Sequence, residues 1–291
     1  MSKILNYGSL NLDYVYRVEH FVQAGETITS SAFSVGCGGK GLNQSIACAR
    51  AGAEIFHAGK IGANGGMLKQ LLETNGVHTE HLQQDEGENG HAIIQVNDGG
   101  ENCILLFPGS NRRIQTAEID AALAHFSGGD YLLLQNEINA LPYLFARAAE
   151  KGMRIVFNPS PITPEILGYP LEKAALFVLN RIEGEALSGE TEPEKILRTL
   201  HGRYPQSSVL LTLGGAGSAY FDGREMLRQP AYPVQAVDTT AAGDTFTGYF
   251  VAAAAAGKSV PQALETAAKA AAIACTRPGA AASIPNLEEV L

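Results

Sequence analysis

Basic residues are scarce in this sequence and nowhere clustered. Its 291 residues include 21 lysines and arginines against 30 aspartates and glutamates, which gives a formal net charge of −9. No cluster of about five basic residues occurs along the chain, so nucleic acid is not expected as a partner. A polyanionic ligand would have to be bound by a local positive group or by backbone N–H groups.

Paired cysteines and long apolar runs are also missing. The four cysteines, Cys37, Cys48, Cys103 and Cys275, include no C-x-x-C pair, which favours reduced thiols over a disulfide or zinc framework. No apolar run reaches the roughly 18 residues that a membrane span needs, and no basic start followed by an apolar stretch marks a signal peptide. We therefore expect a cytoplasmic protein without a membrane span.

Strands alternate with helices over most of the chain. Candidate helices lie at 43–51, 67–74, 116–126, 141–151, 193–202, 244–256 and 261–276, and candidate strands at 3–8, 55–61, 131–135, 153–157, 175–179 and 207–213. This alternation predicts an α/β fold with a mostly parallel central sheet covered by helices on both faces. Because no linker or repeat interrupts it, we expect one domain over residues 1–291.

Two pairs of strand-like runs break the early part of this pattern. The runs at 12–18 and 27–35 precede the first helix, and those at 91–97 and 102–107 flank an Asn-Asp-Gly-Gly turn at 97–100. Asp and Gly tolerate the positive φ of a tight turn, so the second pair predicts a hairpin. We expect segments from about 11–35 and 91–107 to form a small separate sheet, a lid over the site.

Polar or glycine residues follow four successive candidate strands. They are Gln135, Asn136 and Glu137 after the first, Asn158 after the second, Asn180 and Glu183 after the third, and Gly214 to Gly217 after the fourth. In parallel α/β sheets, ligands bind at the carboxyl ends of the strands. These ends are therefore expected to share one cleft.

The segment 236–248 is the strongest candidate for a reactive site. Ala241, Ala242 and Gly243 are small residues at the start of a predicted helix, where unpaired N–H groups and the helix dipole favour anions. Asp244, in the first turn, could accept the proton of an attacking hydroxyl while these N–H groups stabilise a transferring phosphoryl group. The alternative is that Asp244 merely caps the helix.

Two further patterns are interpreted as non-functional. Gly36 to Gly41 fits G-x-G-x-x-G, but no acidic residue follows about 20 positions on, and Lys40 is followed by Gly instead of Ser or Thr, so neither a dinucleotide site nor a P-loop is expected. His78 and His81 have a spacing that could suit a metal. No third ligand is near them in the sequence, and we predict an ordinary polar loop there.

Two stretches resemble the motifs of a known family. Residues 38–44 (Gly-Gly-Lys-Gly-Leu-Asn-Gln) and 238–246 (Asp-Thr-Thr-Ala-Ala-Gly-Asp-Thr-Phe) are similar to those of the PfkB carbohydrate kinases, and the whole chain resembles ribokinase-type members. The resemblance implies a three-layer α/β/α sandwich with a small β-sheet lid. It also implies that Asp244 is the catalytic base and that the backbone of Ala241, Ala242 and Gly243 receives the γ-phosphoryl group of ATP.

The same resemblance implies two sets of ligand-binding residues. Sugar hydroxyls would be bound by Asn11, Asp13, Gly39, Lys40, Asn43, Glu137 and Asp244, and the nucleotide by Asn180, Thr212, Gly214, Gly215, Gly217 and Gly243. Glu183 would hold Mg²⁺ through water, because this ion sheds its hydration reluctantly.

A monovalent-cation site is implied near the C-terminus. Residues 274–283 resemble the ribokinase segment that holds such an ion together with Asp238 and Thr240. The expected contributors are Ala274, Arg277, Gly279 and Ser283. The alternative is an ordinary helix end with a glycine stop at Gly279.

The chain departs from the ribokinase pattern at a few positions. Leu42 stands where a small residue is usual beside the sugar pocket, so it would exclude ribose or favour a deoxy sugar. Tyr14 and Tyr16 are interpreted as one face of a half-buried strand, with a stacking surface for a nucleoside base as the alternative. Ala268 replaces a polar neighbour of the nucleotide, and no role is assigned to it.

The resemblance implies ATP-dependent phosphotransfer to a sugar hydroxyl, most simply the primary hydroxyl of ribose or a related pentose. A nucleoside or another monosaccharide remains open as the acceptor, and so does a sugar-binding protein that has lost catalysis. ATP, Mg²⁺ and K⁺ are the expected cofactors. A homodimer formed through the lid is expected by analogy with the family.

Overall fold

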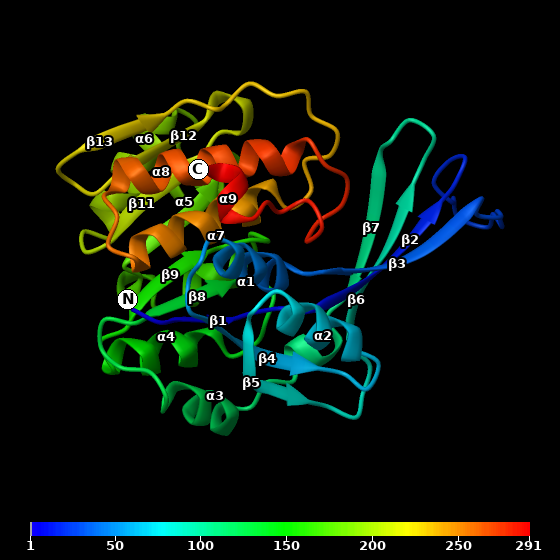
Figure 1. The fold of residues 1–291 in the computed structure, drawn as a ribbon, viewed down its shortest axis with the longest axis horizontal. Coiled ribbons are helices and arrows are strands. Elements are labelled where there is room, and N and C mark those ends of the chain that lie inside the picture. The colour runs from blue at the N-terminus through cyan, green and yellow to red at the C-terminus, as the bar shows by residue number, and fades with distance from the viewer. Residues whose placement is uncertain (1) are drawn as a thin grey trace.

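The computed structural model describes residues 2–291 and contains one large and one small β-sheet (Figure 1). The order in the large sheet is β13 (Met226–Gln229), β12 (Ser218–Phe221), β11 (Ser208–Thr212), β10 (Leu176–Asn180), β9 (Arg154–Asn158), β8 (Tyr131–Gln135), β1 (Ile4–Tyr7), β4 (Ile55–Ile61) and β5 (His78–Gln84). Neighbours from β11 to β5 are parallel, and only β12 and β13 pair antiparallel. The predicted mostly parallel sheet is therefore confirmed.

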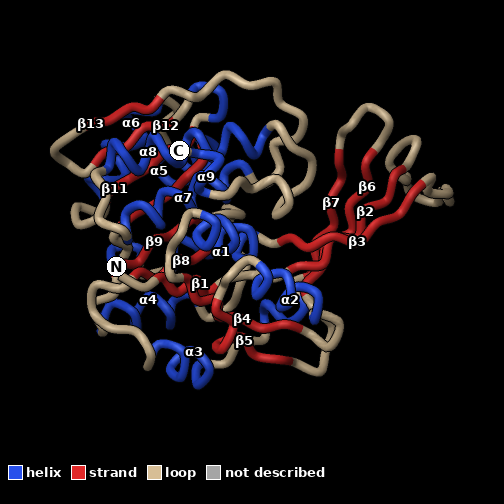
Figure 2. The backbone as a smooth tube through the Cα atoms, viewed as in Figure 1, coloured by secondary structure: helices blue, strands red, loops and turns tan. Residues whose placement is uncertain are grey.

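Helices cover both faces of the large sheet (Figure 2). One face packs against α3 (Thr116–Leu123), α4 (Leu141–Glu150), α5 (Arg181–Ser188) and α6 (Pro193–Arg203), and the other against α1 (Lys40–Arg50), α2 (Gly66–Thr74), α7 (Ala242–Ala255), α8 (Val260–Cys275) and α9 (Leu287–Val290). Short 3₁₀ helices lie at Gly109–Arg112, Pro164–Gly168, Leu171–Lys173 and Gly214–Ala216. This is the expected three-layer sandwich. Within residues 2–291, none of the helices has the length and apolarity to cross a bilayer.

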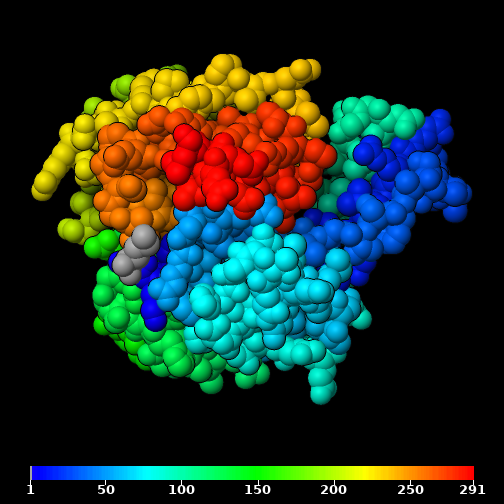
Figure 3. Space-filling view, viewed as in Figure 1, coloured from blue at the N-terminus to red at the C-terminus, as the bar shows by residue number. Residues whose placement is uncertain are grey.

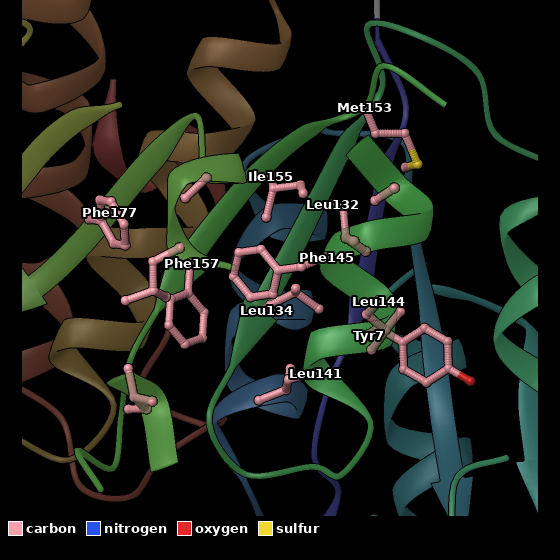
Figure 4. Close-up of a cluster of buried hydrophobic side chains, with 14 of the residues drawn as sticks. Tyr7, Leu132, Leu134, Leu141, Leu144, Phe145, Met153, Ile155, Phe157 and Phe177 are labelled. Atoms are coloured by element: carbon pink, nitrogen blue, oxygen red, sulfur yellow. The ribbon is translucent and has the colours of Figure 1, made fainter. Parts of the chain in front are cut away.

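The core forms because side chains of the central strands alternate between the two faces. Leu132 and Leu134 belong to the hydrophobic cluster on the α3–α6 side, and Leu133 to the cluster on the other side. On the first side, the rings of Phe145 and Phe157 meet edge to face with centroids 5.2 Å apart (Figure 4). Each such fully buried side chain contributes about 1.5–3 kcal/mol to the free energy of folding. This burial holds in place the strands whose ends carry the polar residues.

The small sheet projects from the body (Figure 3). Its strand order is β3 (Ala32–Gly38), β2 (Asn11–Arg17), β6 (Gly90–Val96) and β7 (Asn102–Phe107). The register places Asp13 and Leu106 on one face of this sheet, and Tyr14 and Leu105 on the other. The predicted hairpin at 97–100 is confirmed by the antiparallel pairing of β6 and β7.

Three local predictions differ from the structure. The strand expected at 27–35 begins at Ala32, because β3 starts opposite Arg17, the last residue of β2. His78 and His81 lie in β5, an edge strand of the large sheet, and not in a loop. The short strands β12 and β13 were not predicted. Across residues 2–291 no three His, Cys, Asp or Glu side chains are grouped so as to hold a metal.

Candidate active site

A pocket opens at the carboxyl ends of β9, β10 and β11. Asn158, Asn180 and Thr212 are the last residues of these strands, and all three line the pocket. Its other lining residues are Lys40, Ser160, Val178, Leu179, Glu183, Thr239, Ala241, Gly243, Asp244 and Thr247. The two sequence motifs at 38–44 and 238–246 therefore meet at the carboxyl ends of the strands. Two of the four predicted sets of strand-end residues also line this pocket, Asn158 and the pair Asn180 and Glu183.

Helix α7 begins at this pocket with open backbone N–H groups. Ala241 precedes it in the left-handed conformation, with φ 59, which costs a non-glycine residue about 1–2 kcal/mol. In the described part of the chain, no backbone acceptor bonds to the N–H groups of Gly243 and Asp244. These groups and the helix dipole favour an anion, and the space beside Gly243 is open.

Asp244 lies in the first turn of α7 and is 7% exposed. Its Oδ2 accepts a hydrogen bond of 3.0 Å from Asn43 Nδ2, and its Oδ1 accepts one of 2.9 Å from Gln44 Nε2. The N-cap residue of α7 is Ala241, without a side-chain hydrogen bond, so the interpretation of Asp244 as a helix cap is wrong. The carboxylate joins α7 to α1 and keeps lone pairs for a ligand in the pocket.

Helices α1 and α7 approach closely because α7 carries Gly248. A Cβ at this position would lie 2.4 Å from Ala47 Cβ and 2.8 Å from Gln44 O. No larger residue fits there without pushing the helices apart. The same close approach brings the two amides of α1 within hydrogen-bond distance of Asp244.

Lys40, the first residue of α1, brings a positive charge to the pocket. Burial opposes its charged form, but the carboxylates of Asp244, Glu137 and Glu183 outweigh burial and raise its pKa. Lys40 is therefore cationic at neutral pH. It supplies the local counter-charge that an anionic ligand needs in a protein of net charge −9.

Glu137 lies two residues beyond β8 and is tied to the start of α1. Its Oε2 accepts a hydrogen bond of 2.9 Å from Lys40 N and another from Ser9 Oγ. Ser9 Oγ in turn accepts from Gly41 N at 3.2 Å. Burial raises the pKa of Glu137, although Lys40 and Ser9 act in the opposite direction. Gly39 adopts φ 98, and a Cβ there would lie 3.1 Å from Ser9 O, so this turn requires glycine.

Asn11 and Asp13 come from β2 of the small sheet. The Asp13 carboxylate lies over Gly38, where a Cβ would be 2.1 Å from Asp13 Oδ2. Burial, and then the charge of Glu137, raise the pKa of Asp13 to about 6. Asn11 Oδ1 accepts a hydrogen bond of 2.8 Å from Asn111 Nδ2. The small sheet thus contributes a carboxylate close to Glu137 and an amide bonded to Asn111.

Asn180 and Glu183 form a capping box at the start of α5. Asn180 Oδ1 accepts from Glu183 N, and Glu183 Oε2 accepts from Asn180 N, each at 2.9 Å. Both residues line the pocket together with Asp244. The box fixes the Glu183 carboxylate while leaving lone pairs on both oxygens.

The glycine-rich turn after β11 lies outside the described pocket. Gly214, Gly215 and Gly217 were predicted as nucleotide neighbours, but none is among its lining residues. Gly217 adopts φ 91, and a Cβ there would lie 2.1 Å from Gln229 O. Glycine at this position is explained by the close approach of β12 and β13.

Two loops meet around Asp238. Its Oδ1 accepts from Thr240 N and its Oδ2 from Gly279 N, each at 2.9 Å. Val237 N donates to Cys275 O at 2.8 Å. Burial opposes ionisation of Asp238, but the hydrogen bonds from Thr240 and Gly279 lower its pKa. An ionised carboxylate therefore links the loop before α7 to the loop after α8.

The other predicted cation contributors make contacts within the second loop. Ala274 O accepts a hydrogen bond of 3.1 Å from Arg277 N. Ser283 is completely buried, and its Oγ donates to Ala280 O at 2.8 Å. A carbonyl oxygen has two lone pairs, so Ala274 O can still accept a second partner.

The structure also places the residues at which the chain departs from the ribokinase pattern. Leu42 is completely buried in the core beside Leu12 and Ile46. It offers no exposed surface to a sugar in this structure, and its effect on the choice of sugar stays a prediction. Tyr14 lies on the face of β2 opposite Asp13, as predicted for one face of a half-buried strand. Ala268 is buried in the same core as Leu42.

Several polar residues of the site were not assigned from the sequence. They are Ser9, Gln44, Asn111 and Asn158. Gln44 belongs to the motif at 38–44, and Asn158 follows a predicted strand, so both carried a signal. Ser9 and Asn111 carried none, because their partners are brought to them only by folding.

Comparison with known proteins agrees with this geometry. A family model described as "pfkB family carbohydrate kinase" matches residues 1–287. The ribokinase of Haemophilus influenzae is 33% identical, over 98% of this chain and 95% of that protein. The structure of Cryptococcus neoformans ribokinase in complex with ADP has a TM-score of 0.89 at 33% identity, over 100% of this chain and 99% of that one. The structure of Arabidopsis thaliana ribokinase with ribose and ATP also gives a TM-score of 0.89, at 28% identity and over 99% of this chain and 97% of that one. The chain therefore belongs to the pfkB family of carbohydrate kinases.

Proposed function

We propose that this protein is an ATP-dependent carbohydrate kinase that phosphorylates a hydroxyl of ribose or a related pentose. One observation carries the proposal: the Asp244 carboxylate lies beside the open N–H groups at the start of α7, in one pocket with Lys40. A base, an anion site and a cation side by side are what phosphoryl transfer to an alcohol needs. The ribokinase relatives support the choice of sugar.

In the proposed reaction Asp244 accepts the proton of the acceptor hydroxyl. The N–H groups of Gly243 and Asp244 donate hydrogen bonds to the transferring phosphoryl group, and Lys40 offsets its negative charge. The left-handed Ala241 turns the chain so that these N–H groups face the pocket. Positioning and electrostatics then supply most of the rate.

The residues present fit a nucleotide with Mg²⁺. Asn180, Glu183 and Thr212 border the pocket beside the start of α7. We assign Glu183 to hold Mg²⁺ through water, since its carboxylate is fixed by Asn180 and retains lone pairs. When bound, the ion would offset charge on the nucleotide phosphates.

A monovalent-cation site is proposed at the loops joined by Asp238. Ionised Asp238 and the carbonyl groups at the end of α8 form an oxygen-rich surface next to the start of α7. We expect K⁺ to raise the kinase rate by ordering these loops. Equal rates with K⁺ and with tetramethylammonium at the same ionic strength would remove this part of the proposal.

The sugar is proposed to lie between α1 and the small sheet, which would act as a lid. Asn11, Asp13, Lys40, Asn43 and Glu137 supply the hydrogen-bonding groups. A nucleoside is less well accommodated, because Tyr14 and Tyr16 lie on the face opposite Asp13 and cannot stack on a base bound there.

Residues 1–291 are proposed to act as one kinase domain, and two copies to associate through the small sheet. This sheet exposes apolar side chains on both faces, including Leu105 and Leu106. A cytoplasmic location is proposed from the four cysteines, all free thiols in this structure.

The test is an ADP-release assay with ribose, deoxyribose, fructose and nucleosides as acceptors. We expect ribose or a close pentose to give the highest kcat/KM. Asp244→Asn should lower kcat by about 10²–10⁴ if Asp244 is the base. Near-normal turnover of this variant, or no transfer to any acceptor by the wild type, would contradict the proposal.

A further inference from the structure

Asp244 is held by amide side chains that themselves form a buried chain. Gln44 donates one hydrogen of Nε2 to Asp244 Oδ1 at 2.9 Å and the other to Asn158 Oδ1 at 3.1 Å. Its Oε1 accepts from Gln135 Nε2 at 2.7 Å. Gln44 and Gln135 are both completely buried. Every hydrogen-bonding atom of the Gln44 amide therefore has a protein partner, as expected for a fully buried polar group.

The chain of hydrogen-bonded side chains continues away from the pocket. Gln135 donates to Asn6 Oδ1 at 3.0 Å. Asn6 donates to Ser45 Oγ at 2.8 Å and to Gly41 O at 2.7 Å. Asn6 and Ser45 are completely buried as well. Strands β1 and β8 are thus connected to α1 through uncharged groups that end at the Asp244 carboxylate.

This arrangement permits only one orientation of the Gln44 amide. If the amide were flipped, its oxygen would face the oxygens of Asp244 and Asn158, and its NH₂ group would face the NH₂ group of Gln135. Three favourable contacts would become repulsive. Gln135, together with Asn158 and Asp244 itself, therefore favours the orientation in which Gln44 presents a donor to Asp244.

We propose that Gln44, oriented by Gln135, is a positioning residue for Asp244. The hydrogen bond to Oδ1 restrains rotation of the carboxylate. A base displaced by about 1 Å can lose roughly 10²-fold in rate. The inference rests on the proposed role of Asp244 as the base, and it goes further by assigning a function to two glutamines that contact no substrate.

Gln44→Met is the first test, because Met keeps the length of the side chain and removes the donor. We expect kcat to fall by about 10- to 100-fold, while KM for ribose and for ATP stays within about threefold. The split between kcat and KM is the decisive readout, because displacement of the base lowers kcat without weakening the binding of either substrate. A purely structural role for Gln44 would lower the unfolding temperature and leave the kcat of the folded protein unchanged.

Gln135→Met tests the same hydrogen-bond chain at one remove from Asp244. Met cannot donate to Gln44 Oε1, so the orienting bond is lost although both contacts of α1 with Asp244 remain chemically possible. We expect kcat to fall as in Gln44→Met, by a smaller factor, with KM for both substrates again within about threefold. This variant keeps the inference testable if Gln44→Met does not fold.

Ser207→Ala is the matched control. Ser207 is also buried, and its Oγ donates to Ala174 O at 2.6 Å, before the start of β11 and away from the pocket. We expect it to lower the unfolding temperature without changing kcat. Folded Gln44→Met and Gln135→Met proteins with wild-type kcat would overturn the inference. If the wild type is active and these variants keep its kcat, the proposed function stands without the inference; an inactive wild type refutes the function itself.

Discussion

Among single residues, Asp13 combines a raised pKa with a position on the face of the small sheet next to Glu137. Burial, and then the charge of Glu137, bring its pKa to about 6. As the pH falls through this value the carboxylate takes up a proton. An ionised carboxylate only accepts hydrogen bonds, which suits two neighbouring sugar hydroxyls, whereas the protonated form loses acceptor capacity.

We therefore expect kcat/KM for the sugar to decrease below about pH 6, approaching tenfold per pH unit. The KM for ATP should depend much less on pH over this range, because Asp13 is not among the residues that line the nucleotide pocket. Initial rates between pH 5 and 8, with each substrate varied in turn, provide the measurement. A flat sugar profile between pH 5 and 7 would contradict the assignment.

Asp13→Asn separates binding from folding. The folded-state pKa of Asp13 lies above the ordinary value of 3.8 for an aspartate, so ionisation of Asp13 lowers the free energy of unfolding as the pH rises from about 4 through 6. At pH 8 the variant should unfold at a higher temperature than the wild type and bind sugar more weakly, without the limb near pH 6. A lower unfolding temperature at pH 8 would show that the carboxylate is not strained by burial.

The site shows which residue roles a sequence can and cannot disclose. The place of Asp244 at the start of a helix after three small residues is local information, which left a base and a helix cap open; the resemblance to the PfkB motif implied the base. Gln44 lies 200 residues away from Asp244 in the sequence. It belongs to the motif at 38–44, but that motif does not say whether the amide only fills the core or also holds a base. The burial of Leu42 was likewise invisible, since a motif does not say which side of a helix faces the ligand.

At the level of elements, the contact between α1 and α7 sets the geometry of the site. It depends on Gly248, where a Cβ would lie 2.4 Å from Ala47 Cβ. Gly248→Ala must separate the helices and cost about 1–3 kcal/mol by overpacking. Because Asn43 and Gln44 would move away from Asp244, we expect kcat to fall as well. Urea unfolding and the kinase assay measure the two effects.

Gly202→Ala in α6 is the control for this change. It is also a helical glycine, but its added Cβ meets no atom within 4 Å. Replacement there should stabilise the protein by about 0.5–1 kcal/mol through reduced backbone entropy, with unchanged kcat. If Gly248→Ala behaved like Gly202→Ala, the close helix contact would not govern the site.

The elements predicted best are those buried on both faces. Strand β8 reads as an unbroken run, Leu132 to Leu134, and was placed correctly because both faces are covered. Strand β5 is an edge strand whose sequence, HTEHLQQ, is mostly polar, so it was mistaken for a loop. The start of β3 depends on pairing with Arg17 across the small sheet, which no local pattern specifies.

At the scale of the whole molecule, the small sheet is the part that this chain leaves uncovered. Leu105 is 67% exposed and Leu106 is 45% exposed, on opposite faces of β7. The loop after β2 already lies against the Leu105 face, since Val22 N donates to Gln95 Oε1 and Ile93 and Ile28 share a pocket. The face of Leu106, which also carries Asp13, has no such cover, so we expect it to contact the second copy.

Adjacent substitutions can test this arrangement because neighbouring side chains of a strand point to opposite faces. The wild type should be a dimer at micromolar concentration by sedimentation or light scattering. Leu106→Lys should dissociate it and raise KM for the sugar, because the proposed lid would lose its support beside Asp13. Leu105→Lys introduces the same charged side chain one residue away, on the opposite face of the sheet. This variant should remain dimeric. A monomeric wild type would remove the proposed dimer, and dissociation by Leu105→Lys alone would move the interface to the other face.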